Sequence, residues 1–166
     1  GAYCAGLPRK FRVCKVFDEK EWKADFIIQK EKETLYKFDA PSYAGVSGDD
    51  FWAYSGDLDK DGAPEIVIAA LENISNGLGV RFYNIHVFRN PIKSAFQKPF
   101  TFPIQEFGEK GNFIYDPKRK ETLILLTYWT GYDTLDKKRG MGTYLVGKWF
   151  RFRNDRLQPV FDEPSL

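Results

Sequence analysis

The sequence predicts an all-β protein in which small antiparallel sheets repeat in a propeller-like (blade) arrangement. Runs rich in Val, Ile, Phe, Tyr and Trp alternate with clusters of Gly, Asn, Asp and Lys over 166 residues, 17% of which are aromatic. This alternation is typical of strands joined by turns. The run 144–153 places Tyr144 and Phe152 on one face and Trp149 and Arg151 on the other, which is the period of a strand. A strand-turn-strand pattern also repeats along the chain, which indicates stacked copies of one unit.

The strand signal is clearest in a few segments, and we expect a strand in each of them. The stretch 18–32 is the one candidate for a helix, but it lacks the apolar stripe that an amphipathic helix needs. Residues 26–41 have the order strand, charged turn, strand and end in Phe-Asp-x-Pro, and the same order recurs at 150–164. The expected strands are 26–28, 34–38, 66–70, 80–88, 122–129 and 143–153.

The repeats suggest one β domain, 1–166, with approximate units 1–41, 42–104 and 105–166, the first of them incomplete. Blade-like sheets bury both faces by stacking on the next copy. Closed propellers use about four or more blades, so these units are too few for an ordinary closed propeller. We therefore expect 12–17 to pair with 156–161 and to close the domain within a monomer. Two chains meeting at that edge, or an open stack of sheets, are the alternatives.

The charge balance and hydropathy argue against two classes of protein. Lys and Arg number 25 and Asp and Glu 23, and this net charge of +2 does not indicate a nucleic-acid partner. No run approaches 18 apolar residues, so we expect no transmembrane span.

Cys4 and Cys14 are the only cysteines, and they flank a short segment that contains Gly6 and Pro8. A disulfide can close such a segment, and disulfides persist in oxidising compartments. Because the chain also starts at Gly1 as though already trimmed, we expect a secreted or periplasmic protein. Two unrelated thiols are the alternative, which would allow the cytosol. No Cys-x-x-Cys is present, so zinc lacks support.

Residues 55–65, Ser-Gly-Asp-Leu-Asp-Lys-Asp-Gly-Ala-Pro-Glu, carry the strongest functional signal, and we name 57–65 the acidic loop. Calcium takes about six to eight oxygen ligands, which alternate acids in a tight loop can supply, whereas magnesium prefers to keep its waters. The loop does not match an EF-hand, because the twelfth position, which must be a bidentate Glu, is Ile68 here. A solvated acidic turn without metal is the alternative. The candidate calcium ligands are the carboxylates of Asp57, Asp59, Asp61 and Glu65 and the carbonyl of Ala63.

The order Gly-Asp-x-Asp-x-Asp-Gly-x-x-Glu, followed by an Ile/Val strand, resembles the FG-GAP repeat of integrin α-subunit propellers and the related bacterial VCBS repeats. The resemblance covers roughly 45–88, about a quarter of the chain. It implies a calcium-binding loop between two strands of a propeller blade, with the same five residues as ligands. Phe51-Trp52 replaces the Phe-Gly that usually precedes the loop. The equivalent segment of the next unit, 115–121, resembles an ordinary β-turn, and we expect no second metal there.

The sequence offers little support for catalysis. His86 is the single histidine and no Gly-x-Ser-x-Gly elbow is present, so histidine-based and serine-based mechanisms lack support. Asp49 and Asp50 are neighbours, and in a strand they would point to opposite faces. We therefore expect a non-enzymatic protein- or glycan-binding module. A carbohydrate-active hydrolase with a carboxylate site is the alternative.

Aromatic side chains supply the candidate binding surface. Trp52, Trp129, Tyr132 and Trp149 could contact a glycan or a protein through their flat, amphipathic rings. The long connection 130–142 is a further candidate, because recognition residues concentrate on loops carried by a rigid frame. The alternative is that these aromatic residues fill the cores between sheets.

Overall fold

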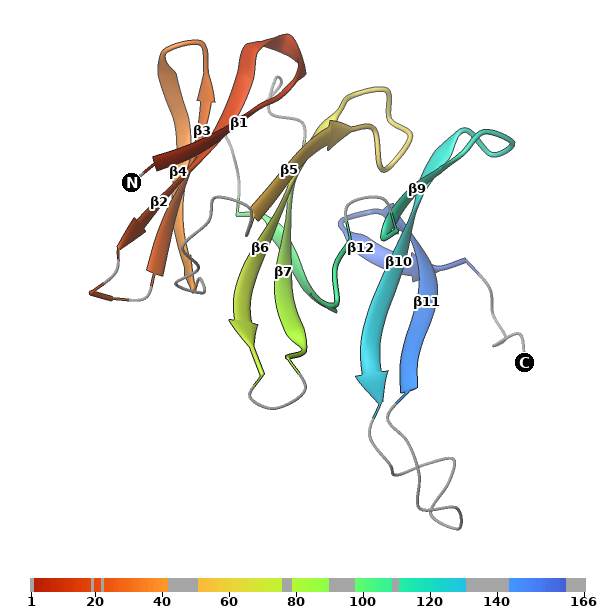
Figure 1. Cartoon of the computed structure of the whole chain (residues 1–166). Coiled ribbons are helices and arrows are strands. Elements are labelled where there is room, and N and C mark those ends of the chain that lie inside the picture. Colours follow the sequence, from red (N-terminus) through yellow and green to blue (C-terminus); the bar gives the residue numbers. More distant parts are fainter. Residues whose placement is uncertain are drawn as a thin grey trace.

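The computed structural model describes residues 2–18, 20–21, 23–41, 51–75, 79–89, 98–108, 111–130 and 144–160. Over these residues the chain forms three four-stranded antiparallel sheets that stand in a row (Figure 1). The all-β prediction is confirmed. Within each sheet, strands that follow one another in sequence are also neighbours in space.

Each sheet takes four consecutive strands. The first contains β1 (Ala2–Gly6), β2 (Phe11–Asp18), β3 (Lys23–Lys30) and β4 (Glu33–Pro41), with a short 3-10 turn (Pro8–Lys10) between β1 and β2. The second contains β5 (Phe51–Gly56), β6 (Glu65–Ile74), β7 (Arg81–Phe88) and β8 (Phe100–Gln105). The third contains β9 (Phe113–Asp116), β10 (Glu121–Thr130), β11 (Tyr144–Arg153) and β12 (Arg156–Pro159).

Strand β6 is buried on both faces, and it joins two hydrophobic cores. Ile66, Ile68 and Ala70 belong to the core that the first and second sheets share, where they meet Val13, Phe26 and Ile28. The residues between them face the other way, into the core of the second and third sheets; these are Val67, Ala69 and Leu71, which meet Ile124 and Phe152. A continuous apolar run is what a strand covered on both sides requires.

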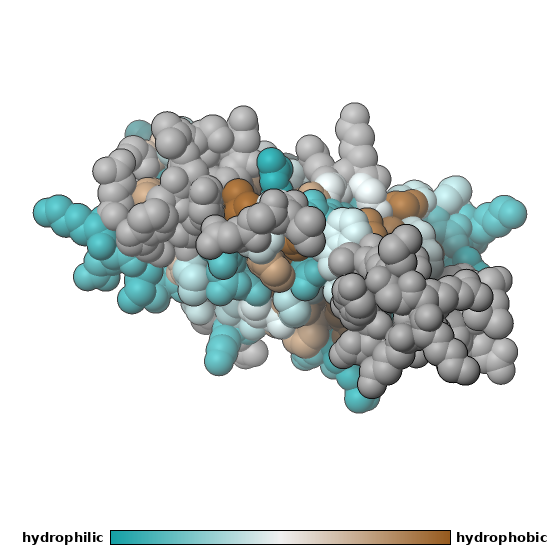
Figure 2. Space-filling view, turned by 60° about the horizontal axis from the view of Figure 1, so that its bottom comes forward, coloured by the Kyte–Doolittle hydropathy of each residue, from teal (hydrophilic) through white to brown (hydrophobic). Residues whose placement is uncertain are grey.

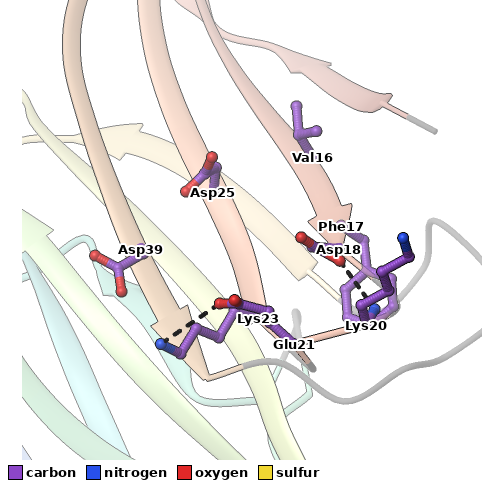
Figure 3. Close-up of a pocket in the computed structure, with 8 residues that line it drawn as sticks. All are labelled: Val16, Phe17, Asp18, Lys20, Glu21, Lys23, Asp25 and Asp39. Carbon is purple, nitrogen blue, oxygen red and sulfur yellow. Dashed lines mark hydrogen bonds and ion pairs between the residues drawn. The ribbon is translucent and has the colours of Figure 1, made fainter.

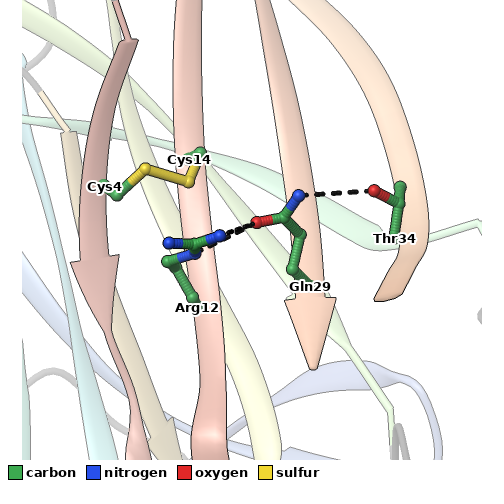
Figure 4. Close-up of a disulfide and its surroundings, with 5 residues drawn as sticks. All are labelled: Cys4, Arg12, Cys14, Gln29 and Thr34. Atoms are coloured by element: carbon green, nitrogen blue, oxygen red, sulfur yellow. Dashed lines mark hydrogen bonds between the residues drawn. A yellow bond between two sulfur atoms is a disulfide. The ribbon is translucent and has the colours of Figure 1, made fainter. Parts of the chain in front are cut away.

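The first sheet corrects the expectation of an incomplete first unit, because β1 completes it. Its residues, Ala-Tyr-Cys-Ala-Gly, are mostly small and have little intrinsic strand preference, so the sequence did not indicate a strand there. Cys4 lies directly opposite Cys14 in the β1–β2 pair and is bonded to it, which confirms the predicted disulfide (Figure 4). The disulfide therefore holds β1 at the edge of the sheet, where the small side chains of β1 would contribute little packing.

The expected pairing of 12–17 with 156–161 is wrong. Strand β2 lies between β1 and β3, so both of its edges are already hydrogen-bonded. Strand β12 pairs with β11 within the third sheet, which stands at the opposite end of the row (Figure 1). The completed first sheet removes the free edge on which that expectation depended.

Most of the coloured residues on the face that Figure 2 shows are hydrophilic. Hydrophilic side chains extend at both ends of the row, and hydrophobic residues reach the surface in small separate patches between them. Large apolar side chains that are exposed include Tyr115 and Leu145 in the third sheet. Isolated exposed apolar residues of this kind are normal for a globular protein.

His86 on β7 is buried between the first and second sheets. Its Nδ1 lies 3.0 Å from Thr101 Oγ1, and its ring centroid lies 5.1 Å from that of Phe38 on β4. Its Nε2 is buried and has no hydrogen-bond partner within the described part of the chain. Because burial disfavours the charged imidazolium, the pKa of His86 falls to about 4.

We predict that His86 makes the fold acid-sensitive. Unfolded His86 takes up a proton below pH ~6.5 and folded His86 only near pH 4, so its stabilising effect is complete above pH 6.5 and is lost as the pH falls toward 4. The loss amounts to about 3 kcal/mol of unfolding free energy. Urea unfolding of wild type and His86→Gln at several pH values measures it. Their free-energy difference should change across this window, and a constant difference contradicts the assignment.

The disulfide should contribute measurably to stability. Replacing both Cys4 and Cys14 by Ala should lower the unfolding free energy by about 2–3 kcal/mol, because the unfolded chain regains the freedom of the closed segment. Urea unfolding without reductant measures the change, and Cys4→Ala alone should match the double variant. An unchanged urea midpoint would show that β1 is held by other contacts.

Candidate metal centre

The acidic loop joins β5 to β6 and is wound tightly by its own side chains. Asp59 Oδ1 accepts a hydrogen bond from the backbone N–H of Asp61 (3.2 Å), and Asp61 Oδ1 accepts one from that of Ala63 (2.8 Å). Asp57 Oδ2 accepts one from the N–H of Gly62 (3.0 Å). Gly62 has φ +85°, a conformation that costs glycine little and other residues more. Short polar side chains that bind the backbone two residues on are typical of such turns.

The start of the loop depends on a second glycine, Gly56. A Cβ atom there would collide with the ring of Tyr54, two residues earlier on β5. The close approach lets the Tyr54 ring lie over the strand end, directly before the first acid of the loop. A bulkier residue at this position would displace the ring or the loop.

Four carboxylates of the loop converge. One oxygen from each of Asp57, Asp59, Asp61 and Glu65 lies within 4.8 Å of the others, an arrangement that could hold a metal ion. Asp57 and Asp61 are exposed, whereas Glu65 is fully buried. Ala63, the expected carbonyl ligand, lies in the same loop and is nearly buried. The sequence therefore identified which acids the fold brings together.

Glu65 is the most strongly perturbed member of the group. Its Oε2 accepts a hydrogen bond from the backbone N–H of Leu58 (2.6 Å), and its buried Oε1 has no hydrogen-bond partner among the residues that the structure describes. Burial raises the pKa of Glu65 to about 8, the negative charges of Asp59 and Asp61 add to the rise, and the Leu58 hydrogen bond opposes it. A buried carboxylate oxygen without a partner is costly, and a bound cation would remove that cost.

The protein supplies little positive charge of its own to this group. Arg89 Nη2 lies 3.4 Å from Asp59 Oδ2. Asp57, Asp61 and Glu65 form no ion pair with any residue that the structure describes. Asp57 and Gly62 also line a cavity of about 290 Å³, shared with Arg9 of the 3-10 turn and Phe11 of β2, which offers an approach to the acids.

A larger pocket, of about 750 Å³, lies at one end of the first sheet, away from the acidic loop (Figure 3). Asp25 and Asp39 lie directly opposite each other on β3 and β4 at its wall. Asp25 is paired with Lys37 (2.8 Å), and Lys23 lies 4.0 Å from Glu21. Acids with exposed lysine partners are typical of a solvated surface. Asp49 and Asp50, the carboxylates considered from the sequence, lie outside the described residues.

The candidate binding residues occupy different places. Trp52 stacks on Tyr54, with ring centroids 5.4 Å apart, and packs beside Phe113 at the edge of the core of the second and third sheets. Trp129 and Trp149 are half-buried on β10 and β11 of the third sheet. Tyr132 and residues 131–142 of the connection 130–142 lie outside the described residues.

Sequence reasoning missed the residues that attach the acidic loop to the third sheet. Arg153 Nη1 donates to the carbonyl of Leu58 (2.8 Å), and Lys60 Nζ donates to the carbonyl of Arg119 (2.6 Å). Arg89 ion-pairs with Asp155 as well as Asp59. The partners lie far apart in the chain, and no local pattern marks them.

The fold and this site define an all-β protein of repeated sheets, with one disulfide and an acidic group that could hold a cation. Comparison with protein-family models, with curated proteins and with solved structures finds no match to the chain. Among the described residues there is no helix of the length and apolarity needed to cross a membrane.

We predict that Glu65 makes the metal-free protein less stable as the pH rises. Unfolded Glu65 loses its proton near pH 4.5, whereas folded Glu65 keeps it until about pH 8. Its contribution is therefore complete below pH 4.5 and is lost between pH 4.5 and 8, on the order of a few kcal/mol. Urea unfolding of wild type and Glu65→Gln, both in chelator, should show their free-energy difference changing over this range. A difference independent of pH would contradict the prediction.

Proposed function

We propose that this protein is an exported, non-enzymatic β module whose acidic loop binds one structural Ca²⁺ and whose role is to bind a protein or a glycan. One observation carries the metal assignment. The buried Glu65 has an oxygen that no described residue hydrogen-bonds, and a Glu65 oxygen lies within 4.8 Å of oxygens from three aspartates. This arrangement is costly without a cation and favourable with one.

The ligand chemistry supports calcium. The acidic group offers oxygens, with neither histidine nor cysteine among them, and such hard ligands suit Ca²⁺ and Mg²⁺ and not zinc or copper. Several carboxylates and a backbone carbonyl, that of Ala63, match the larger coordination number of calcium. The resemblance to FG-GAP and VCBS repeats supports the same ion. When bound, calcium would neutralise the loop and hold the β5–β6 connection in one shape.

Two further observations support export and a binding role. The Cys4–Cys14 disulfide is of a kind that persists in oxidising compartments. The single histidine is buried with its pKa lowered to about 4, which leaves it unprotonated at neutral pH and enclosed by Phe38 and Thr101. The disulfide supports export, and the buried, neutral histidine supports a binding role over histidine-based acid–base catalysis.

Calcium titration tests the proposal. Isothermal titration should find one Ca²⁺ per chain, and calcium at about 100 times its Kd should raise the unfolding free energy by about 2.7 kcal/mol. Asp59→Asn should abolish this increment because it removes a charged ligand. The matched control is Asp25→Asn, since Asp25 is an acid of the first sheet that pairs with Lys37 away from the acidic loop.

The control variant should keep the full calcium-dependent increment, whatever its own stability. Identical melting curves in calcium and in excess chelator would refute the proposal. Hydrolysis of a glycan by the wild type and by Asp59→Asn alike would instead support the hydrolase alternative.

A further inference from the structure

The acidic loop, which connects β5 to β6 of the second sheet, also attaches to the third sheet. We propose that metal binding in the acidic loop stabilises the docking of the third sheet against the second. We call the contacts that Leu58, Asp59 and Lys60 of the loop make with the third sheet and with Arg89 the clasp. The inference rests on the proposed calcium site. It adds a coupling between that site and residues that no metal would touch.

A chain of hydrogen bonds connects the two. Glu65, a candidate ligand, accepts a hydrogen bond at its Oε2 from the backbone N–H of Leu58 (2.6 Å). The carbonyl of the same Leu58 accepts a hydrogen bond from Arg153 at 2.8 Å. Arg153 in turn pairs at 2.6 Å with Glu121, which is only 3% exposed. The peptide groups around Leu58 therefore link the metal ligand to a buried ion pair of the third sheet.

The side chain of Leu58 strengthens this link. It is fully buried and belongs to the same core cluster as Ile124 and Phe152 of the third sheet. A shift of the loop backbone at this position would disturb a hydrogen bond and a close-packed contact together. A close-packed core has little free volume, so it can accommodate such a shift only if side chains repack.

Two more contacts fasten the outer side of the loop. Lys60, with φ +62°, donates to the carbonyl of Arg119 at 2.6 Å in the β9–β10 turn. Arg89 bridges Asp59 of the loop (3.4 Å) and Asp155 of the β11–β12 turn (2.8 Å). The loop thus reaches both turns at this end of the third sheet.

The opposite end of the third sheet is held without the loop. The carbonyl of Gln105, at the end of β8, accepts a hydrogen bond from Thr127 Oγ1 at 2.6 Å. The Gln105 side-chain oxygen accepts one from the backbone N–H of Trp129 at 2.7 Å. The third sheet is therefore held at one end by contacts independent of the metal and at the other by the acidic loop.

The physical coupling follows from charge. Without a cation, the neighbouring carboxylates of Asp57, Asp59 and Asp61 repel one another and favour a wider loop. A cation draws them together and so stabilises the backbone shape on which the Leu58 and Lys60 contacts depend. Because such coupling is reciprocal, docking of the third sheet must raise metal affinity by the same factor.

Amide hydrogen exchange of the full chain, with calcium and with chelator, tests the clasp. Calcium should slow exchange about tenfold in peptides covering 113–123 and 150–158, which contain the two clasped turns. The amide of Trp129 and its neighbours, held by Gln105, should change much less.

A reciprocal test uses calcium affinity. Lys60→Met should weaken calcium binding about fivefold, because it removes the bond to the Arg119 carbonyl. The control is Lys118→Met, which removes one positive charge from the β9–β10 turn that Lys60 contacts, but Lys118 has no side-chain contact with the loop among the described residues. If the two variants have similar calcium affinities, the effect of Lys60→Met comes from the lost charge and not from the lost contact. That result would overturn the proposed coupling.

The outcomes separate the two proposals. Calcium binding with unchanged exchange in both turns overturns the clasp and leaves the calcium site standing. Absence of calcium binding overturns both. The exchange comparison needs only the wild-type chain, so a variant that fails to fold leaves the test intact.

Discussion

Burial of β6 on both faces is the constraint on which the rest of the structure depends. A strand with apolar residues on each face must be covered on each side, so the second sheet requires a neighbour in front and another behind. The first and third sheets meet that need and complete two cores. Sheets arranged in this way stack in a row and do not need to curve into a ring. The same strand begins at Glu65, so the central element of the fold and the buried acid of the candidate metal site are one piece of chain.

The sequence predicted well those features that local pattern controls. The strands around Ile66–Ala70 and 80–88 were visible because apolar and β-branched residues are dense there, and the acidic loop was visible because its acids alternate. Strand β1 was missed because its small residues carry no strand signal, and a cross-strand disulfide compensates for that. The pairing of 12–17 with 156–161 was wrong for the same reason, since a hidden strand already occupied the edge.

The environment of the acidic loop was beyond sequence reasoning. The depth of Glu65 and the rise in its pKa come from cores assembled by all three sheets. The hydrogen bond from Arg153 to Leu58 joins residues 95 positions apart, and no local period encodes such a contact. Alternating carboxylates indicate that a loop can take a cation. The surrounding sheets decide which of those carboxylates is desolvated and what else the loop holds.

The position of the disulfide has a consequence for how the molecule behaves when thiols are reduced. Strand β1 is an edge strand that is mostly exposed, and β2 behind it carries the buried Phe11 and Val13. If reduction frees β1, the hydrogen-bonding edge of β2 becomes accessible, and an unpaired edge is a template on which other chains can add. The bridge then protects against self-association as well as unfolding. Light scattering during incubation with reductant would rise if this is so, and would stay flat if β1 stays in place unaided.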